Sequence, residues 1–306
     1  MKACFFGMGS IGSRHARSLK SWAERTGRRV ETHAFRSSKG APESGDIDRS
    51  IAEWTALEPP YDLLFITNPT ALHYETLQKT AGLAEAYFVE KPLFHTSSLP
   101  MDFLDAFKGK TTYVACPMRF HPVIEHLKQR GAQGVAGARV LCSSYLPEWR
   151  KSRDYRTVYS ARRALGGGAA LDLIHELDYV RFLFGDPVRS VRAAGKFSSL
   201  EIDSDDMAAF ILSYPERVVE VHLDYFGRVP RREIELFCEE DVLVGDLLRN
   251  TLTSLVSGEQ TVFPKEDIYE KEMEYFLAKA EAGEETFNSF QTSLETLRLA
   301  EGGESR

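Results

Sequence analysis

The segment GGGAALDLIHELDYV, residues 166–180, places side chains that can move a proton directly after a run of glycines. Asp172 and His175 lie in it, followed by Glu176 and Asp178. An imidazole accepts or donates a proton near neutral pH, and a neighbouring carboxylate can orient it or bind a hydroxyl group. A single histidine on a helix is more often an ordinary core or surface residue, so this segment alone does not establish a catalytic site.

The segment YFVEKP, residues 87–92, gives a second candidate because Lys91 stands between an apolar strand and a proline. Ligands of open parallel sheets bind beyond the carboxyl ends of the strands, which is where Lys91 falls. Proline restricts the backbone of Lys91, and partial burial would lower the pKa of its ammonium group toward that of a useful proton donor. An exposed surface lysine is the alternative.

A glycine-rich turn lies at the start of the chain, with Gly7, Gly9 and Gly12 spaced as GxGxxG around Ser10 and Ile11. It follows an apolar strand pattern at residues 2–6 and opens a helical pattern at residues 11–25. Glycines allow a tight turn and close approach of the backbone, and the helix N-terminus offers N–H groups to a pyrophosphate. This context predicts a dinucleotide site.

The end of the second predicted strand, residues 30–35, indicates which dinucleotide is bound. NAD sites usually carry Asp or Glu there, whereas this strand continues into Arg36, Ser37, Ser38 and Lys39. An arginine fork and two hydroxyl groups suit a 2′-phosphate, so the sequence predicts NADP(H) over NAD(H). A solvated basic loop is the alternative.

Two domains are predicted from the order of the patterns. Residues 1–118 alternate apolar strands with helical segments, which is typical of a Rossmann domain with a parallel sheet. Residues 119–265 contain successive alternating runs joined by short turns and one strong helix at 171–184, which predicts an α/β domain with an open, mostly antiparallel sheet. Residues 266–306 return to helix and are expected to pack back on the first domain.

A polar wedge is predicted on the 171–184 helix when it is drawn as one continuous helix. Leu173, Leu177, Val180 and Phe184 fall in one apolar stripe. Since apolar residues cover more than half of the circumference, we expect the opposite wedge to face a cleft. That wedge contains Asp172, His175, Glu176 and Tyr179.

The segment before the glycine run is rich in arginine and aromatic residues. Aromatic faces stack on rings, and arginine forks pair with phosphate or carboxylate, so the segment is a candidate for wrapping an anionic, ring-bearing substrate. An ordinary basic surface loop is the alternative. The candidate substrate contacts are Trp149, Arg150, Tyr155, Arg156 and Tyr159, together with Asp172 and His175.

Composition limits the classes of function. The chain has 306 residues and a formal net charge of −7, which argues against nucleic-acid and membrane-surface partners. Its four cysteines lack metal-ligand spacing, so no metal site is expected. The N-terminus is too short and too glycine-rich for a signal peptide, and no apolar run approaches the ~18 residues of a membrane span, so we expect a cytoplasmic protein.

The chain resembles the glucose–fructose oxidoreductase / inositol dehydrogenase (Gfo/Idh/MocA) family through five motifs in the same order. These are GMGSIGSRHA at 7–16, ITNPTALHYETL at 66–77, VEKPL at 89–93, MRFHP at 118–122 and GGGAALDLIHELDY at 166–179. The resemblance implies a Rossmann domain and a second domain whose open sheet forms a homo-oligomer. It also implies hydride transfer between a nicotinamide and a sugar-type carbon.

The resemblance also assigns residues to roles. Lys91 is expected to touch the reacting oxygen and the cofactor. The further cofactor contacts expected are Thr67, Asn68, Pro69, His73, Glu90 and Arg119. One departure concerns the pair after the glycines, because many family members have Asp and His four residues apart, whereas Asp172 and His175 are three apart.

Together these features predict an enzyme, an NADP(H)-dependent oxidoreductase acting on a sugar or nucleotide-linked sugar. His175 would exchange the hydroxyl proton, Lys91 would donate to the same oxygen, and Asp172 would orient the sugar or polarise His175. Three alternatives stay open: a glycosidase assisted by a bound nicotinamide, a dehydrogenase for a non-sugar substrate, and a non-catalytic NADP(H)-binding regulator.

Overall fold

A computed structural model describes residues 1–36 and 45–303 of the chain, which divides into two compact units. The first unit contains Met1–Pro117 and Asp267–Leu294. The second contains Met118–Glu266 and the described part of Glu295–Arg306, so the division falls inside the last helix, α8 (Phe290–Glu301).

The first unit is built on a parallel sheet whose strand order is β3-β2-β1-β4-β5-β6. All of its strand pairs are parallel, which confirms the predicted Rossmann-type sheet. The strands are β1 (Lys2–Phe6), β2 (Glu31–Phe35), β3 (Arg49–Ile51), β4 (Tyr61–Ile66), β5 (Ala84–Val89) and β6 (Thr111–Val114). Only β3 was not predicted, because three residues are too few to show an alternating pattern.

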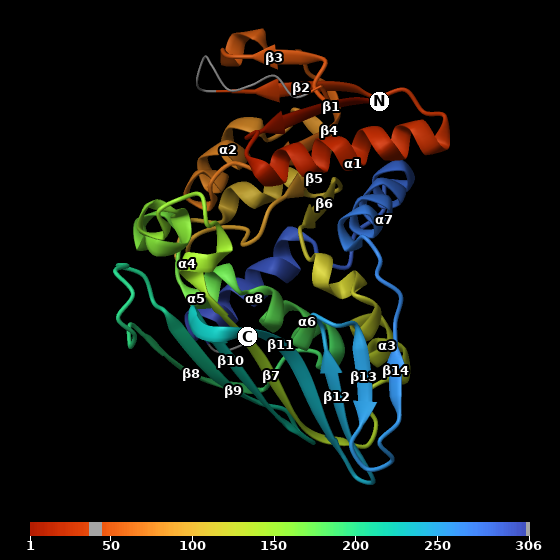
Figure 1. The fold of residues 1–306 in the computed structure, drawn as a ribbon. Coiled ribbons are helices and arrows are strands. Elements are labelled where there is room, and N and C mark those ends of the chain that lie inside the picture. The colour runs from red at the N-terminus through yellow and green to blue at the C-terminus, as the bar shows by residue number, and fades with distance from the viewer. Residues whose placement is uncertain (37–44, 304–306) are drawn as a thin grey trace. The chain divides into compact units, whose positions relative to one another are not determined.

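Helices cover this sheet through their apolar faces. Helix α1 (Ser10–Thr26) ends at Gly27, whose φ of 68° suits a left-handed C-cap. Helix α7 (Ile268–Ala282) lies beside α1 (Figure 1), and both contribute to one core with the sheet. That core includes Phe5, Leu19, Trp22, Phe65, Phe88, Met273 and Phe276. Helix α2 (His73–Thr80) follows the 3₁₀ turn Thr70–Leu72, and two other 3₁₀ turns cover Trp54–Ala56 and Asp102–Phe107.

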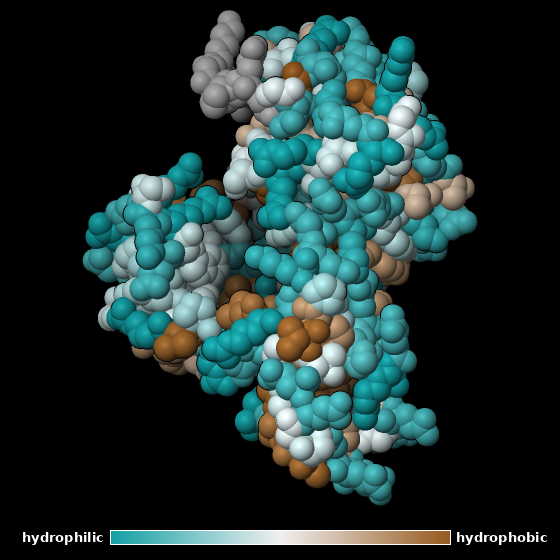
Figure 2. Space-filling model, turned by 45° about the vertical axis from the view of Figure 1, so that its right-hand side comes forward, coloured by the Kyte–Doolittle hydropathy of each residue, from teal (hydrophilic) through white to brown (hydrophobic). Residues whose placement is uncertain are grey.

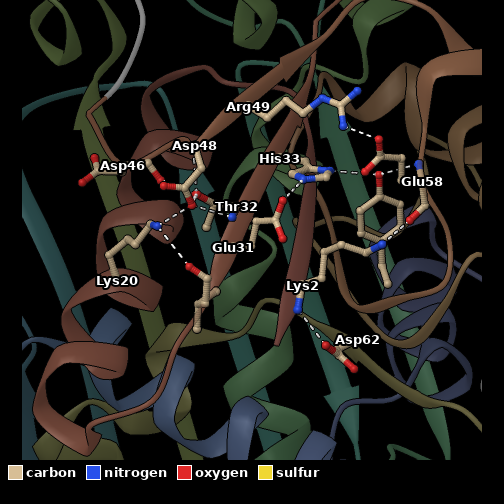
Figure 3. A network of polar contacts seen from close by, with 12 residues as sticks. Lys2, Lys20, Glu31, Thr32, His33, Asp46, Asp48, Arg49, Glu58 and Asp62 are labelled. Carbon is tan, nitrogen blue, oxygen red and sulfur yellow. Dashed lines mark hydrogen bonds and ion pairs between the residues drawn. The ribbon is translucent and has the colours of Figure 1, made fainter.

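A polar network ties together the amino ends of the strands in this sheet (Figure 3). Asp48 accepts hydrogen bonds from the backbone and hydroxyl of Thr32, both at 2.8 Å, and from Lys20 at 2.6 Å. His33 lies between Glu31 and Tyr61. Because ligands of such sheets bind at the opposite, carboxyl edge, we interpret this network as structural.

The second unit is built on a larger sheet with the order β14-β13-β12-β11-β7-β10-β9-β8. Only the β7–β10 pair is parallel among the described strands, so the predicted mostly antiparallel sheet is confirmed. The strands are β7 (Val135–Tyr145), β8 (Arg189–Gly195), β9 (Met207–Ser213), β10 (Val218–Asp224), β11 (Phe226–Cys238), β12 (Val242–Asp246), β13 (Thr251–Ser254) and β14 (Gln260–Val262).

The helices of the second unit differ from the prediction in two places. Helix α3 (Pro122–Arg130) was missed, although Pro122 at its first position is an ordinary start signal; its N-cap is His121, whose side chain accepts from the backbone of Val123. The predicted helix 171–184 is two helices, α5 (Ala169–Asp172) and α6 (His175–Phe184). Helices α3 and α6 contact each other, and α6 packs on β7 (Figure 1). The remaining helical turns are α4 (Leu146–Trp149), Pro117–Phe120, Tyr155–Thr157, Tyr159–Ala161 and Arg163–Leu165.

Apolar side chains are exposed on one face of the larger sheet. Val191 of β8 and Ile211 of β9 pair across the strands and are 52% and 43% exposed. Figure 2 shows apolar patches among polar side chains on the lower part of the surface, where Figure 1 draws the strands of this unit. Within the described residues, no helix has the length and apolar character needed to cross a membrane.

Candidate functional site

At the carboxyl edge of the first sheet, the glycine turn after β1 lies against the turn that follows the neighbouring strand β4. Strands β2 and β4 flank β1 on opposite sides, so the strand order reverses direction at β1. Gly7 has φ of +106°, and a Cβ there would lie 2.5 Å from the backbone nitrogen of Asn68. A Cβ on Gly12 would collide with the carbonyl of Gly7 and lie 2.7 Å from Thr67 Oγ1. Only glycine permits this approach of the two loops.

The start of α1 presents backbone N–H groups at the same edge. Gly9 is the N-cap residue and supplies no side-chain cap, and the first turn of α1 contains no acidic residue. Ser10 is exposed and Ile11 is half-buried. Uncapped N–H groups and the positive end of the helix dipole form a natural anion site.

The turn after β4 supports the glycine loop directly. Thr67 is buried and donates its hydroxyl to the carbonyl of Gly7 at 2.5 Å. Asn68 is half-buried, and its amide donates to Thr76 Oγ1 at 2.9 Å. Pro69 is exposed. The predicted contacts at Thr67, Asn68 and Pro69 therefore lie beside the predicted contacts at Gly7 and Gly12.

Glu90, Lys91 and His73 also gather at this edge, but two of their side chains bind the protein itself. Glu90 accepts a hydrogen bond from His15, with 2.6 Å between Oε1 and Nε2. His73 is fully buried, with Nε2 2.9 Å from the carbonyl oxygen of Asn68. Lys91 is half-buried, and its peptide bond to Pro92 is cis. Direct cofactor contacts by Glu90 and His73 stay predictions.

Arg36 directly follows the end of β2, and its backbone N–H donates to the carbonyl of Ile51. Ser37, Ser38 and Lys39 lie outside the described residues. Trp54, in the 3₁₀ turn Trp54–Ala56, was not identified from the sequence. It is 37% exposed, stacks on Phe6 and packs at a tilt on Phe35, the last residues of β1 and β2. A single tryptophan in a short turn gives no pattern that would have identified it.

The break between α5 and α6 changes the interpretation of the candidate segment 166–180. Leu173 has φ −95° and ψ 28°, which ends α5, and α6 starts at His175. Asp172 and His175 therefore belong to different helices, and the argument that they share one helical face is wrong. His175 is half-buried at the first position of α6, whereas Asp172 is 5% exposed.

The predicted wedge does not face a cleft as a whole. Glu176 is fully buried and accepts a hydrogen bond from Arg232 Nε at 2.6 Å. Tyr179 is also fully buried, and burial raises the pKa of its hydroxyl well above the usual range. The prediction of a cleft-facing wedge is wrong for these two residues, because both are buried in the second unit.

Asp172 is held by three hydroxyl groups of the second unit. Ser160 donates to one carboxylate oxygen at 2.7 Å and Tyr225 donates to the same oxygen at 3.2 Å. Tyr159 donates to the other oxygen. Asp172 thus joins the segment before the glycine run to Tyr225, the residue that separates β10 from β11.

A cavity of about 120 Å³ opens in that same segment. It approaches the roughly 150 Å³ of a cavity that admits benzene in another protein. Four of the predicted substrate contacts line it, whereas the exposed guanidinium of Arg156 binds Asp154 and Glu201 instead. The lining residues are Leu146, Trp149, Arg150, Tyr155, Val158, Tyr159 and Ser160.

Two lining residues differ in how they are fixed. Trp149 donates its ring N–H to Ser144 Oγ at 2.9 Å and meets the ring of Tyr225 edge-on, with centroids 5.3 Å apart. Arg150 is exposed, and its guanidinium has no carboxylate partner in the described ranges. The cavity therefore offers rigid aromatic surface beside an unpaired positive charge.

Arg119, a predicted cofactor contact, is anchored inside the second unit. It is 5% exposed and makes two parallel hydrogen bonds to Asp178, Nε to Oδ2 at 2.9 Å and Nη2 to Oδ1 at 2.7 Å. Its guanidinium also lies 5.1 Å from the ring centroid of Phe182. This bidentate geometry fixes the orientation of the side chain.

Comparison with known sequences identifies related proteins. Residues 124–244 match the sequence model of the GFO/IDH/MocA C-terminal domain. An uncharacterized oxidoreductase, YrbE of Bacillus subtilis (strain 168), is 25% identical over 224 residues, which cover 70% of this chain and 64% of that protein. The scyllo-inositol 2-dehydrogenase (NAD(+)) of the same organism is 29% identical over 171 residues, covering 52% of this chain and 47% of that protein. The matched parts thus span less than two thirds of either relative.

Comparison with solved structures shows the fold over nearly the whole chain. Levoglucosan dehydrogenase in complex with NADH aligns with a TM-score of 0.81 at 16% identity, covering 99% of this chain and 95% of that one. The UDP-N-acetylglucosamine 3-dehydrogenase GnnA from Acidithiobacillus ferrooxidans aligns with a TM-score of 0.79 at 20% identity, covering 99% and 96%.

Proposed function

This chain belongs to the Gfo/Idh/MocA family, and from that premise we propose that it is a nicotinamide-dependent oxidoreductase acting on a sugar-type hydroxyl or carbonyl group. The observation that carries the proposal is the glycine turn at the carboxyl edge of the parallel sheet. There the strand order reverses and Gly7 and Gly12 leave no room for a Cβ. This is the geometry in which a doubly wound sheet holds a dinucleotide.

The residues at this edge fit such a cofactor. The pyrophosphate would meet the N–H groups at Gly9, Ser10 and Ile11, and the first turn of α1 contains no acidic residue. Trp54 would offer a flat apolar surface to the adenine, since it is partly exposed beside the ends of β1 and β2. The nicotinamide, when bound, accepts or supplies a hydride.

The proposed preference for NADP(H) rests on Arg36. It follows the end of β2, where an NAD site usually carries a carboxylate, and a planar guanidinium fits the two oxygens of a 2′-phosphate. Related structures solved with NADH support a nicotinamide dinucleotide in general and do not speak for this preference.

Replacing Arg36 with alanine tests the cofactor preference. We expect the affinity for NADPH to fall roughly tenfold to a hundredfold, the size of a lost charge-assisted contact, with the affinity for NADH unchanged. Quenching of tryptophan fluorescence gives both dissociation constants. Arg28→Ala is the matched control, because Arg28 pairs with Glu281 on the surface of the same unit. Tighter binding of NADH by the native chain would contradict the preference.

The proposed chemistry assigns one proton-transfer group to each unit. His175 would take up or return the proton of the substrate hydroxyl, and Lys91 would donate a hydrogen bond or proton to the same oxygen. Lys91 lies in the first unit and His175 in the second. Their action on one substrate atom is part of the proposal and rests on the sequence motifs.

The proposed substrate is a small sugar-type molecule with an anionic or nucleotide-linked group. The cavity beside Trp149, Tyr155 and Tyr159 suits the face of a ring, and the unpaired guanidinium of Arg150 suits an anion. Asp172, buried beneath Tyr159 and Ser160, supports the wall of this cavity.

Turnover measurements test the assigned roles. A panel of neutral, acidic and nucleotide-linked sugars is followed by absorbance of the reduced nicotinamide. We expect Lys91→Ala and His175→Ala each to lower kcat by about 10²–10⁴-fold while the dissociation constant for NADPH stays unchanged. Lys108→Ala and His126→Ala, both at exposed positions, are the matched controls. Near-native kcat in either test variant would remove that residue from the mechanism.

A further inference from the structure

His15 is a buried histidine that none of the predicted roles uses. It lies on α1, eight residues after Gly7, and its side chain is fully buried. Its ring packs against Phe88 of β5, with 4.7 Å between centroids, and lies 6.3 Å from the ring of Tyr269 on α7. Its Nε2 atom lies 2.6 Å from the Oε1 atom of Glu90.

The surroundings of His15 define which nitrogen carries the hydrogen. Nδ1 is buried and has no hydrogen-bond partner among the described residues. Because Nε2 faces the Glu90 carboxylate and Nδ1 faces no acceptor there, we assign a hydrogen to Nε2. His15 is then a fixed donor to Glu90.

Glu90 connects His15 to the backbone of Lys91 through its two carboxylate oxygens. Its second oxygen, Oε2, accepts the backbone N–H of Lys91 at 3.2 Å. Burial raises the pKa of the Glu90 carboxyl, but the hydrogen bond from His15 and the electrostatic effects of His15 and Lys91 outweigh it, so the pKa lies below its usual value. The carboxylate remains ionised and can accept from both donors.

A second histidine holds the chain on the other side of Lys91. The Nδ1 atom of His73 is 3.1 Å from the carbonyl oxygen of Pro92 and 3.2 Å from that of Leu93. Its Nε2 atom is 2.9 Å from the carbonyl oxygen of Asn68. The backbone is therefore held on both sides of Lys91. On one side Glu90 links the Lys91 amide to His15 of α1, and on the other side His73 links Pro92 and Leu93 to the turn after β4.

We propose that His15 is a positioning residue that fixes Lys91 through Glu90, while His73 fixes the chain after it. The pair His15–Glu90 joins the helix that follows the glycine turn to the residue proposed to meet the substrate oxygen. Loss of this donor shifts the lysine ammonium group away from its place at the cofactor edge. The inference rests on the proposed function only in treating Lys91 as the group that acts on substrate.

Two substitutions of His15 separate positioning from packing. His15→Gln keeps an N–H donor near the position of Nε2, whereas His15→Phe fills the ring volume and removes the donor. The matched control is His33→Phe, because His33 is also fully buried in the first unit but lies at the amino end of the sheet, bound to Glu31 and Tyr61. Each variant is measured for kcat, substrate KM, NADPH dissociation constant and Tm.

The expected result is a selective loss in kcat. His15→Phe lowers kcat on the order of tenfold to a hundredfold, the effect of a small misplacement of a reacting group, with KM and NADPH affinity close to native. His15→Gln restores most of that loss, and His33→Phe lowers Tm without a matching change in kcat. Equal kcat in His15→Gln and His15→Phe would overturn the inference. A kcat loss in His33→Phe as large as that in His15→Phe would also overturn it.

A readout that needs no turnover separates this inference from the proposed function. The rate at which an amine-reactive reagent labels Lys91 is followed by peptide mass spectrometry in the wild type and the three variants. We expect that rate to change in His15→Phe and to stay native in His33→Phe and His15→Gln. If the wild type oxidises or reduces no sugar while labelling still depends on His15, the proposed function fails and the positioning role stands. Unchanged labelling and unchanged kcat in His15→Phe would overturn the positioning role.

Glu90→Gln serves where His15→Phe does not fold. The amide keeps the shape of the side chain, removes its charge and weakens the acceptor facing His15. We expect it to lower kcat and alter Lys91 labelling in the same direction as His15→Phe. Native values for both measurements would contradict the proposal.

Discussion

Two carboxylates from the recognised motifs are held by donors of the protein itself. Glu90 accepts from the His15 ring and the Lys91 amide, and Asp172 accepts from Tyr159, Ser160 and Tyr225. Held in this way, a carboxylate orients its neighbours, because its lone pairs are directed at fixed donors. Both residues thus help to shape the loops that carry Lys91 and the cavity.

Glu90 gives the protein a pH-dependent contribution to stability. Burial opposes ionisation, but the His15 hydrogen bond and nearby positive charge bring the net pKa below its usual value of 4.5. Since the folded-state pKa is depressed, the contribution is present above pH 4.5 and is lost as the pH falls through the folded-state pKa. We expect Glu90→Gln to be less stable than the wild type at pH 7, with the difference shrinking as the pH falls below 4.5.

Urea denaturation at a series of pH values measures this difference in the free energy of unfolding. Glu75→Gln is the control, since Glu75 is exposed and pairs with Lys79 one helical turn away. A difference between wild type and Glu90→Gln that grows toward low pH would contradict the assignment.

At the scale of elements, the short loops after the strands determine the geometry of the candidate site more than the strands themselves do. The turn into α1, the turn after β4 and the loop after β5 meet because parallel strands present their carboxyl ends on one side. In the second unit, the break between α5 and α6 likewise determines where side chains lie. Asp172 and His175 belong to different helices, and Glu176 of α6 accepts a hydrogen bond from Arg232.

Gly12 in the first turn of α1 tests the dinucleotide site. A Cβ at Gly12 collides with Gly7 and lies 2.7 Å from Thr67 Oγ1. We expect Gly12→Ala to weaken NADPH binding at least about tenfold or to prevent folding, because backbone atoms must move. Gly45→Ala is the steric control, because a Cβ at Gly45 meets nothing within 4 Å and Gly45 lies outside the proposed cofactor contacts.

Fluorescence titration with NADPH and the Tm of each variant measure this effect. Native affinity and native Tm in Gly12→Ala would show that the close approach of α1 to the turn after β4 is not required.

At the scale of the whole molecule, the outer face of the larger sheet has a pattern suited to self-association. In one row across the strands, Val191 and Ile211 are followed by Glu220 and Arg139, which form an ion pair at 3.3 Å. Exposed apolar residues beside a polar strip are typical of an isologous interface. We propose that two copies of the chain associate through this face.

Ile211→Glu tests this association. A carboxylate at a buried apolar contact is costly, so we expect the variant to run as a monomer where the native chain runs as a dimer or larger species. Size-exclusion chromatography with light scattering gives the mass. Leu72→Glu, at an exposed apolar residue of the first unit, is the control. An unchanged mass for Ile211→Glu would contradict the proposal.

The sequence determined the features that depend on neighbouring residues. Five of the six strands of the parallel sheet, the glycine turn into α1 and six strands of the larger sheet follow from local apolar patterns and turn residues. The short strands β3, β13 and β14 carry too little pattern, and α3 was missed although Pro122 stands at its first position. The predicted helix across Asp172 and His175 failed because periodicity does not reveal a break of two residues.

Only the tertiary structure decided which side chains bind other groups in the protein interior and which line a cavity. His15 and Glu90 are 75 residues apart, and Asp172 meets Tyr225 across 53 residues, so no local spacing relates them. Four predicted substrate contacts line one cavity while Arg156 binds nearby carboxylates, a choice made by three-dimensional proximity. Residue types fix what chemistry is available, and packing fixes which partner each group meets.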